Sequence, residues 1–344
     1  MSDLTRNIDT NDAVGYADYL VIGAGVSGLA LAGDLHRAGH SVRVLDKGRG
    51  VGGRCATRRF ADGGIADYGA QYFTAQGERF VAWVDAWLAE PNSELREWNR
   101  GYPAYRNGAF AEREPGRPRY APKTGMNAVA KRLAAGVDVR TGVTVSEIAR
   151  TVDGWAVSDG VETYHARRLC LSLPAEQLLR LAGGFLPADA RARLAAVRYD
   201  PAWTLVARLS ADIAFSHPAA EFKDHPVLGF LSRDHTKRAD PSATPTLVVH
   251  ASGVWSRDNL ESEADAAGDA ILDGIAGVFG DLPPVIERFT HRWRYALPTQ
   301  TFGAPFFIGE DARLSVCGDG CGGIRLENAL TTGWDLATAL LRAV

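Results

Sequence analysis

Apolar positions near the start of the chain change from strand spacing to helical spacing and back. Residues 19–22 are apolar or β-branched, which predicts a buried parallel strand. Residues 26–38 carry apolar side chains three or four positions apart, and residues 41–45 again have the length and composition of a strand. The helical apolar positions are Leu29, Leu31, Ala32 and Leu35. We therefore expect a strand, a helix closed by Gly39 and a second strand.

The next segments have helical spacing separated by an irregular stretch. Residues 80–89 and 126–135 each predict a short helix. Residues 99–120 lie between them and are rich in proline, glycine and arginine, so they predict a loop or an irregular hairpin.

A set of short alternating segments follows. They predict a small antiparallel meander with turns at Asp153-Gly154 and Asp159-Gly160. The segments are residues 137–140, 144–148, 155–158 and 162–165. Residues 168–173 then predict a buried strand that ends before Pro174.

The second half of the chain changes character after about residue 186. Three strand-like segments separated by proline-rich connections precede a helix, and this order predicts a sheet covered by one helix. The strands are residues 204–209, 227–231 and 246–250, and the helix is residues 261–278.

The end of the chain returns to the strand-turn-helix pattern seen at its start. Residues 314–318 predict a short apolar strand, and residues 319–323 an acidic, glycine-rich turn. A final helix then presents one apolar face, formed by Leu326, Ala329, Leu330, Gly333, Leu336, Ala337, Leu340 and Leu341. We expect this unit to lie beside the first one and to contact the same ligand.

Composition restricts the classes of partner. The 344 residues carry a net charge of −3, so there is no basic field to hold nucleic acid or an anionic membrane. No stretch reaches the roughly 18 consecutive apolar residues that a spanning helix needs. Residues 1–17 are polar and are expected to form a disordered leader rather than a signal peptide.

The cysteines indicate a reducing compartment and no metal. The four thiols are scattered, without a CxxC pair, which favours reduced, packed cysteines in a cytoplasmic protein. They are Cys55, Cys170, Cys317 and Cys321. A metal or a disulfide at the last two is the alternative, but no histidine or cysteine pair joins them at zinc-finger spacing.

The turn between the first strand and helix carries the sequence Gly23-Ala24-Gly25-Val26-Ser27-Gly28. In this GxGxxG pattern the first glycine allows a tight turn, the second lets a pyrophosphate approach the backbone, and the third lets helix and strand pack closely. The anion would then lie at the positive end of the helix. Asp46 ends the second strand, about 20 residues later, where a carboxylate binds ribose hydroxyls. A dinucleotide is therefore the expected ligand.

Two further segments extend this candidate site. Lys47, Gly53 and Arg54 follow the acid directly, and glycines with an arginine fork can wrap a pyrophosphate, although a solvated loop is the alternative. Gln71 and Tyr72 could border a flat ring, or they could belong to the core.

Five segments in order along the chain resemble the renalase-like flavoproteins, a branch of FAD-dependent oxidoreductases near the amine oxidases. The segments are DKGRGVGGRCATRR, ADYGAQYFTA, HASGVWSRDNLE, HRWRYALP and CGDGCGGIRLENALTTG. The resemblance runs from about residue 18 to the C-terminus. The glycine motifs are shared by many FAD enzymes, whereas DYGAQYFTA and HRWRYA are more particular to this group.

The resemblance implies an α/β fold. A Rossmann-like FAD-binding domain of p-hydroxybenzoate hydroxylase-like (GR2) topology would be interleaved with an α+β substrate domain. The FAD domain would comprise residues 18–79, 121–185 and 292–344, and the substrate domain residues 80–120 and 186–291. It further implies noncovalent FAD and oxidation of 2- or 6-dihydro isomers of NAD(P), with O2 as acceptor and H2O2 as product.

Site residues are carried over from the resemblance one by one. The glycine loop, Asp46, Lys47, Gly53 and Arg54 would hold the dinucleotide part of FAD. Val145 would touch adenine through its main chain, and Asp319 would bind the ribityl chain. Leu326, Glu327 and Asn328, which open the last helix, would face the flavin pyrimidine. His250, Trp255, Trp293 and Tyr295 match segments expected near the flavin face, although a histidine or tryptophan at a strand end more often packs in the core.

One departure from the amine-oxidase pattern bears on the substrate. Monoamine-oxidase-type relatives place an aromatic side chain just before the last helix and often attach FAD to a cysteine there. Residues 320–324 of this chain are Gly-Cys-Gly-Gly-Ile, with no aromatic residue. This leaves the ring face open to a planar substrate, and the spacing argues against covalent attachment at Cys321.

Three functions stay open at this point. The first is hydride transfer from a dihydronicotinamide-like ring to flavin N5. The second is an amine or amino-acid oxidase, or a desaturase of a specialised metabolite, on the same frame. The third is a flavin-holding protein without turnover. A pyridine-nucleotide-dependent reductase is disfavoured because the chain has one dinucleotide fingerprint, which FAD would occupy.

Overall fold

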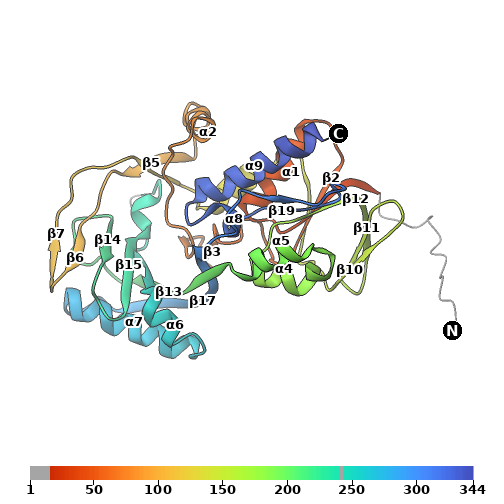
Figure 1. Cartoon of the computed structure of the whole chain (residues 1–344). Coiled ribbons are helices and arrows are strands. Elements are labelled where there is room, and N and C mark those ends of the chain that lie inside the picture. The colour runs from red at the N-terminus through yellow and green to blue at the C-terminus, as the bar shows by residue number, and fades with distance from the viewer. Residues whose placement is uncertain (1–15, 241–242, 344) are drawn as a thin grey trace.

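The computed structural model describes residues 16–240 and 243–343, so most of the expected leader lies outside the described residues (Figure 1). Within this part of the chain, the strands form an eight-stranded sheet, a seven-stranded sheet and two short two-stranded ones. The two large sheets form two lobes that lie side by side in Figure 1.

The eight-stranded sheet is built on a parallel centre. β1 pairs in parallel with β2 and with β12, β2 pairs in parallel with β9, and β12 pairs in parallel with β19. These strands are β1 (Ala17–Ile22), β2 (Val42–Asp46), β9 (Asp138–Thr141), β12 (Thr163–Leu171) and β19 (Leu314–Val316). Three antiparallel strands complete it: β10 (Glu147–Arg150), β11 (Trp155–Ser158) and β18 (Phe307–Ile308).

Helices cover both faces of this sheet. One face carries α1 (Val26–Arg37), α3 (Asn127–Leu133) and α9 (Leu326–Arg342), and the other carries α4 (Ala175–Ala182) and α5 (Ala188–Ala195). A helix on each face of a mostly parallel sheet, with the first βα unit closed by a glycine loop, is the Rossmann-like arrangement. The predicted strand, helix and strand at the start of the chain are confirmed as β1, α1 and β2.

The prediction of the meander was partly wrong. Residues 137–140 were expected in it, but β9 joins the parallel edge beside β2, where Asp138 accepts a hydrogen bond of 2.7 Å from Arg43 Nε. Residues 162–165 and 168–173 were expected as two strands, but they are one strand, β12, whose two halves pair with different neighbours. The first half of β12 pairs with β11, as the meander predicted. The partners of its second half and of β9 lie far away in the sequence, so the local pattern could not assign them.

The seven-stranded sheet has the order β17-β13-β16-β15-β14-β6-β7. Its strands are β6 (Ala104–Arg106), β7 (Ala109–Ala111), β13 (Arg198–Leu209), β14 (Ala219–Phe222), β15 (Leu228–Arg233), β16 (Thr246–Ala251) and β17 (Val285–Gln300). The hairpin β6-β7 confirms the irregular hairpin expected within residues 99–120. β17 was not predicted as a strand, and it pairs with β13 as far as Gln300, so residues 292–300 lie in this sheet. The boundaries of the two domains stay a prediction.

This sheet also has two covered faces. α6 (Gly253–Asp258) and α7 (Ala264–Phe279) pack on one face, through Ile271 and Ile275 among others. The hairpin of β3 (Thr57–Arg59) and β4 (Ile65–Asp67) packs on the other, where Phe60 and Ala66 meet Val206 and Val248. A segment near the N-terminus therefore reaches from the first lobe to the second.

The remaining elements lie outside the two large sheets. They are α2 (Glu78–Leu88), the paired strands β5 (Leu95–Asn99) and β8 (Arg119–Pro122), the 3-10 helices η1 (Gly183–Phe185) and η2 (Asp234–Lys237), and α8 (Asp319–Gly322). The helices expected over residues 80–89, 126–135 and 261–278 are confirmed as α2, α3 and α7, and the expected turn at residues 319–323 is mostly α8.

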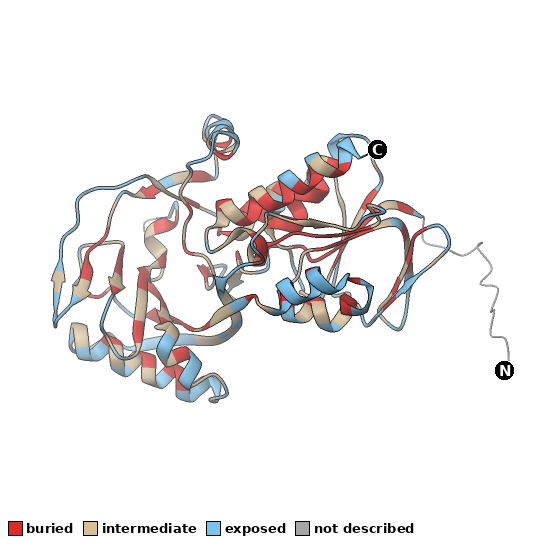
Figure 2. Ribbon diagram, viewed as in Figure 1, coloured by how far each residue is buried: buried red, intermediate tan, exposed pale blue. Residues whose placement is uncertain are grey.

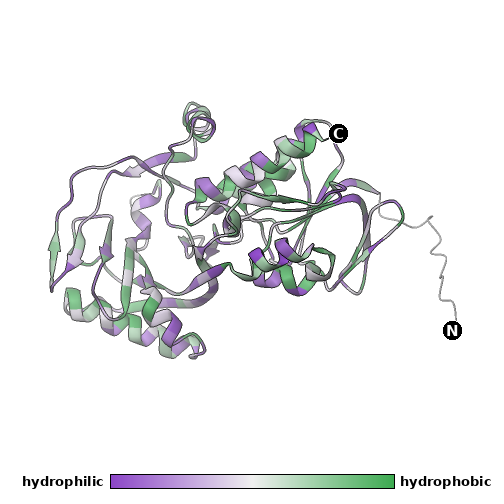
Figure 3. Ribbon diagram, viewed as in Figure 1, coloured by the Kyte–Doolittle hydropathy of each residue, from purple (hydrophilic) through white to green (hydrophobic). Residues whose placement is uncertain are grey.

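Burial follows the hydrophobic pattern from which the elements were predicted. The strands of the parallel sheet and the facing sides of α1 and α9 are buried in Figure 2, and the same segments are hydrophobic in Figure 3. The cysteines predicted to pack are all buried free thiols: Cys55, Cys170, Cys317 and Cys321. Among the helices of the described residues, none has both the length and the apolar character needed to cross a bilayer.

Candidate active site

The glycine loop between β1 and α1 has the geometry that the sequence predicted. Gly23 has a φ of +110°, and a Cβ there would clash with the backbone of Ser172. A Cβ on Gly28 would clash with the Gly23 carbonyl, so this glycine allows the close packing of helix on strand. Beside Gly25, in contrast, no heavy atom lies within 4 Å of the place a Cβ would take. The loop is therefore tight where it folds and open where a pyrophosphate would approach, and it fits FAD.

The neighbours of these glycines within the loop have structural contacts. Ala24 is fully buried, and Ser27 Oγ donates a hydrogen bond of 2.6 Å to the carbonyl of Ala329 in α9. The hydroxyl of Ser27 thus holds two helices together. Val26, half-buried, begins α1.

Asp46 lies at the end of β2 and faces the glycine loop. Its Oδ2 accepts a hydrogen bond of 2.7 Å from Ala24 N, and its Oδ1 accepts one of 2.6 Å from Gly48 N. An ionised carboxylate has about four acceptor positions, so two stay available for ribose hydroxyls. Lys47, next to it, is exposed.

The loop that carries Val145 lies against the same acid. Val143 N donates a hydrogen bond of 2.9 Å to Asp46 O, and Gly142 N donates one of 2.8 Å to Gly48 O. Val145 follows two residues later and is half-buried. The structure therefore brings the segment expected at adenine beside the residue expected at ribose.

Arg54 joins three distant segments of the chain. Gly52 N donates a hydrogen bond of 2.9 Å to Ala24 O, which docks this segment on the glycine loop and places Gly53 beside Gly25. The guanidinium of Arg54 then makes a bidentate ion pair with Asp319, with Nη2 2.7 Å from Oδ1, and donates a hydrogen bond of 3.0 Å to Tyr295 O.

Burial and the ion pair with Asp319 act in opposite directions on the pKa of Arg54, and the ion pair has the larger effect. Burial lowers the pKa of Arg54, but the Asp319 carboxylate outweighs burial and holds that pKa above its usual value. The pair brings the start of the first βα unit and the acidic turn before α9 together, as expected from the sequence.

Two glycines of the turn before α9 have close neighbours where a Cβ would lie. A Cβ on Gly320 would lie 2.6 Å from Tyr199 Oη, and one on Gly322 would lie 2.6 Å from Asn328 O. Burial raises the pKa of Cys321, in the same turn, to about 12, so its thiol is neutral at pH 7.

The residues that open α9 divide between two environments. Leu326 and Asn328 are half-buried. Glu327 is buried, and its Oε1 accepts hydrogen bonds from Gln76 N, at 3.2 Å, and from Gly77 N at the start of α2. The carboxylate of Glu327 therefore caps α2, and it also pairs with Arg325.

Gln71 belongs to a buried ionic cluster that the sequence analysis missed. The cluster consists of Asp67, Asp234, Lys237 and Arg238, and the side chains of the first three are fully buried. Lys237 Nζ lies 3.2 Å from Asp67 Oδ2 and 2.6 Å from Asp234 Oδ1, and it donates a hydrogen bond of 3.0 Å to Gln71 Oε1. Burial raises the pKa of Asp67, but Arg238 and Lys237 outweigh it and hold that pKa below its usual value. The local sequence gives no signal of this cluster, because Lys237 and Arg238 lie in a polar stretch that is typical of solvated residues.

His250 is fully engaged in the interior. Its Nδ1 lies 2.8 Å from Thr204 Oγ1, and its ring also hydrogen-bonds the backbone of Gly69. Burial and then the positive charge of Lys237 lower the pKa of His250 to about 4, so the ring is neutral at pH 7. Both observations indicate a residue that positions the segment after β4.

Trp293 and Tyr295 lie on β17 at the junction of the two lobes. Trp293 Nε1 donates a hydrogen bond of 2.9 Å to Tyr68 O, and the two rings stack at 5.4 Å. The ring of Tyr295 meets that of Tyr199 edge-on at 5.6 Å. Trp255 packs elsewhere, with α6 on the α7 side of the sheet.

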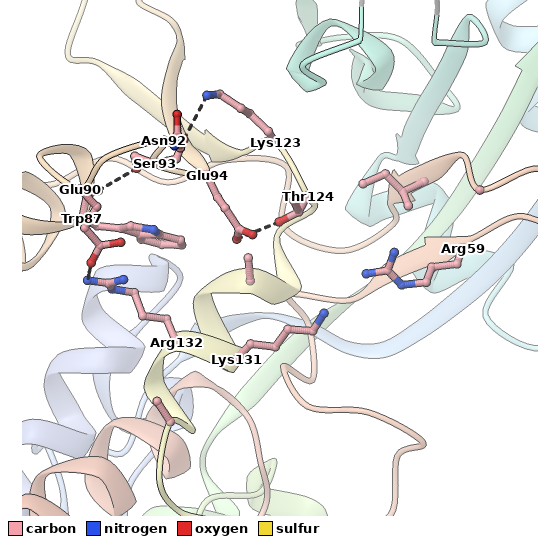
Figure 4. Close-up of a pocket in the computed structure, with 14 residues that line it drawn as sticks. Arg59, Trp87, Glu90, Asn92, Ser93, Glu94, Lys123, Thr124, Lys131 and Arg132 are labelled. Atoms are coloured by element: carbon pink, nitrogen blue, oxygen red, sulfur yellow. Dashed lines mark hydrogen bonds and ion pairs between the residues drawn. The ribbon is translucent and has the colours of Figure 1, made fainter.

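Tyr72 belongs to a cluster of aromatic rings beyond Gln71. Its Oη lies 2.6 Å from Tyr102 Oη, and its ring packs against Trp98 and Phe230. A separate hollow of ≈ 840 Å³ lies between α2, α3 and the β3-β4 hairpin, with Arg59 and Lys131 at its border (Figure 4). None of the candidate FAD residues lines this hollow.

Comparisons with known proteins agree with this geometry. Residues 21–87 match the model of an NAD(P)-binding Rossmann-like domain, and residues 104–341 match that of flavin containing amine oxidoreductases. The flavin-dependent L-tryptophan oxidase RebO of Lentzea aerocolonigenes is 46% identical over 54 residues, which span 16% of this chain and 11% of that protein.

Solved structures share the fold over nearly the whole chain. Cyclohexylamine oxidase from Brevibacterium oxydans IH-35A has a TM-score of 0.72 and 16% identity, and covers 96% of this chain and 99% of its own. Wild-type putrescine oxidase bound to putrescine has a TM-score of 0.70 and 14% identity, and covers 95% of this chain and 99% of its own. Because the second family model spans most of the sequence, the chain belongs to the flavin-containing amine oxidoreductase family and is an FAD-dependent oxidoreductase.

Proposed function

We propose that the chain is an oxidase of the renalase type, which oxidises 2- or 6-dihydro isomers of NAD(P) and uses O2 as acceptor. The chemistry that FAD supplies when bound is hydride acceptance at N5 and reoxidation by oxygen to give H2O2. The substrate ring becomes aromatic when it loses the hydride, so the protein has to position two planar rings rather than remove a proton.

The observation that carries the proposal is the glycine turn before α9. Residues 320–324 carry no aromatic side chain, and a Cβ on Gly322 would lie 2.6 Å from the carbonyl oxygen of Asn328, so this turn supplies no wall of an amine cage. A site without that wall accepts a flat ring more readily than a flexible amine. The buried, neutral thiol of Cys321 supports noncovalent FAD, since thiolate is the reactive form.

The chain's own residues would have the following roles. The open side of Gly25 would receive the pyrophosphate, Asp46 and Lys47 would bind the adenosine end together with Val145, and Asp319 would bind the ribityl chain. Leu326, Glu327 and Asn328 would face the pyrimidine, where the N-terminus of α9 favours negative charge by about 0.3 to 1 kcal/mol. His250, which is hydrogen-bonded to Thr204 and to the backbone of Gly69, would hold the Gly69 backbone in place.

Anaerobic reduction tests the proposal. Purified holoenzyme is mixed with the 2-, 4- and 6-dihydro isomers of NAD(P), and absorbance at 450 nm is followed. We expect the 2- or 6-dihydro isomer to bleach the flavin far faster than the 4-dihydro isomer, and H2O2 to form when air is admitted. Persistence of the yellow colour with all three isomers would remove this function and favour a flavin-holding protein.

An amine or amino-acid oxidase is the second candidate, because the family and the fold neighbours include amine oxidases and one short match is to an L-tryptophan oxidase. The same assay with putrescine, cyclohexylamine and L-tryptophan separates the two. An amine that reduces the flavin faster than every dihydronicotinamide isomer would establish the second candidate and reject the first.

A further inference from the structure

Arg119 is a half-buried side chain, and two of the three nitrogens of its guanidinium lack a hydrogen-bond partner in the described part of the chain. Its Nε and Nη1 are buried, and among the described residues neither atom has a hydrogen-bond partner. The ion pairs of the described chain do not include Arg119 either. Burying these two N–H-bearing nitrogens without a hydrogen bond is costly, because their N–H groups lose water and gain nothing in return.

The surroundings of Arg119 hold it in place without neutralising it. Its Cζ lies 4.5 Å from the centre of the Tyr102 ring and 5.4 Å from that of Tyr72. The two tyrosine hydroxyls bond each other at 2.6 Å, so they are engaged. Glu221, whose charge acts on Tyr102, is paired with Lys223 and Arg113. The aromatic rings therefore fix the position of the cation while its N–H groups stay unused.

A second orphaned group lies directly opposite. Asn99 is the cross-strand partner of Arg119 in the β5-β8 pair. Its Oδ1 and Nδ2 are both buried and without a partner among the described residues. One unpaired group can be an isolated defect, but Nε and Nη1 of Arg119 and Nδ2 of Asn99 come from opposite positions of one ladder and are donors of the kind that an anionic oxygen group accepts from.

The segment 69–77 connects this set to the candidate flavin site. At one end Ala70 N donates a hydrogen bond of 2.8 Å to Arg54 O. In the middle Phe73 and Tyr120 exchange backbone hydrogen bonds of 3.0 and 2.8 Å, which places Tyr72 beside Arg119. At the other end Arg325 and Glu327, at the start of α9, bind Thr74 and Gly77. Arg119 thus lies one short segment away from the residues expected at the flavin ring.

We propose that Arg119, with Asn99, binds an anionic oxygen group of the substrate, and that Tyr72 and Tyr102 hold the guanidinium ready for it. This inference rests on the proposed function, because it places the substrate next to the flavin. The chemistry is that of a carboxylate or a phosphate, and either can take a bidentate contact from an arginine fork. A dihydronicotinamide nucleotide carries phosphate and an amino acid carries carboxylate.

Isothermal titration calorimetry of the holoenzyme tests the inference without turnover. Two pairs of probes each differ in one anionic group: nicotinamide mononucleotide against nicotinamide riboside, and indole-3-acetate against indole-3-acetamide. We expect the anionic member of one pair to bind on the order of tenfold to a hundredfold more tightly. The pair that shows the preference identifies the source of the anion.

Variants assign that preference to Arg119. Arg119→Gln is expected to reduce the preference to about twofold or less, and Arg119→Lys to retain part of it, because the charge stays while the fork is lost. Arg117→Gln removes an exposed arginine two residues earlier and should leave the preference unchanged. The FAD content of each variant is measured by absorbance, to check that the variant is still holoenzyme. If Arg119→Gln does not fold, the anion preference of Arg119→Lys is compared with that of the wild type instead.

Two results would overturn the inference: equal binding within both pairs, which would mean that only water satisfies Arg119, or a preference that survives in Arg119→Gln. Either outcome is independent of the flavin-reduction assay. If dihydronicotinamide reduces the flavin but no anion preference is found, the proposed function stands and the role of Arg119 is rejected. If an anion preference is found but no dihydronicotinamide reduces the flavin, the role of Arg119 stands and the proposed function is rejected.

Discussion

At the scale of single residues, Gly25 and Gly28 belong to one motif but have different surroundings. Space is open beside Gly25, whereas a Cβ on Gly28 would enter the Gly23 carbonyl. Gly25 also has an ordinary extended backbone, with φ of −72°, which alanine adopts without strain. One glycine of the motif therefore serves the ligand, and the other serves the fold.

Gly25→Ala is expected to weaken FAD binding by roughly tenfold or more, because the added methyl occupies the approach of the pyrophosphate. The melting temperature of the FAD-free protein should stay close to that of the wild type.

Gly28→Ala is the matched variant and should lower the free energy of unfolding by about 3 kcal/mol even without FAD. Fluorescence titration with FAD and thermal melts of the FAD-free proteins measure both. Unchanged FAD affinity in Gly25→Ala would contradict the assignment of the loop.

His250 makes stability depend on pH in a defined window. The pKa of its ring is about 4 in the folded protein against the ordinary histidine pKa of 6.5, so the unfolded chain binds the extra proton first as pH falls. Stability is therefore full above about pH 6.5 and declines as pH falls toward 4. Between pH 7.5 and pH 5 the loss from this group is about 2 kcal/mol. Urea unfolding at both pH values should show a smaller loss in His250→Gln, and an equal loss in both proteins would reject this role.

Some site residues could be predicted from the sequence, and others could not. The loop glycines, Asp46 and Arg54 follow a fixed spacing because strand, turn and helix are contiguous in the chain. Gln71 bonds Lys237 across 166 positions, and His250 bonds Thr204 across 46 positions. No local periodicity reports such a contact, and Lys237 in a polar loop has the sequence context of a solvated residue.

At the scale of elements, α1 and α9 pack together although they lie at opposite ends of the chain. The contact depends on Gly333, where a Cβ would overlap the carbonyl of Ser27. The apolar face of α9 was predictable from its spacing, but its partner was not. For the same reason β9 was assigned to the wrong neighbours, because a short alternating strand has the same pattern in a meander and at a parallel edge. The pairing of β11 with the first half of β12 was predicted correctly.

Gly333→Ala is expected to separate the two helices and to lower the free energy of unfolding by about 3 kcal/mol, because the obstacle is backbone rather than a movable side chain. FAD content should fall with it, since α1 carries the glycine loop and α9 the flavin end. Gly277→Ala in α7 is the matched control. No heavy atom lies within 4 Å of its Cβ position, so this variant should gain about 0.5 to 1 kcal/mol. Chemical denaturation distinguishes the two, and a stable Gly333→Ala would show that the helices can move apart freely.

At the scale of the whole molecule, the chain crosses between the two large sheets repeatedly. β1 and β2 lie in the first sheet, β6 and β7 in the second, β9 to β12 in the first, β13 to β17 in the second, and β18 and β19 in the first. The buried ionic cluster adds a fixed contact, because Asp67 is the last residue of β4 and Asp234 and Lys237 belong to η2 of the other lobe. The sequence predicted that segments of the two domains alternate along the chain, but the ionic cluster was found only in the structure.

Lys237→Met is expected to lower the free energy of unfolding by about 3 to 5 kcal/mol, because it leaves two buried carboxylates with one cation. Lys223→Met provides the comparison: Lys223 pairs with Glu221 at a more exposed position, so this variant should lose less than about 1 kcal/mol. Urea unfolding monitored by tryptophan fluorescence measures both. Equal losses would mean that the cluster does not contribute as a buried network.

The repeated crossings and this cluster together predict that the two lobes unfold as one unit. Neither sheet is a continuous piece of chain, so the loss of one sheet removes connections that constrain the other. Differential scanning calorimetry should therefore show a single transition, and saturating FAD should move the whole of it upward, by about 2.7 kcal/mol of stability at a hundredfold excess over its Kd. FAD should therefore stabilise the seven-stranded sheet as well, although it is expected to bind at the eight-stranded sheet. A separate early transition that FAD does not shift would show instead that the second lobe folds independently, and the ionic cluster would then join two autonomous domains.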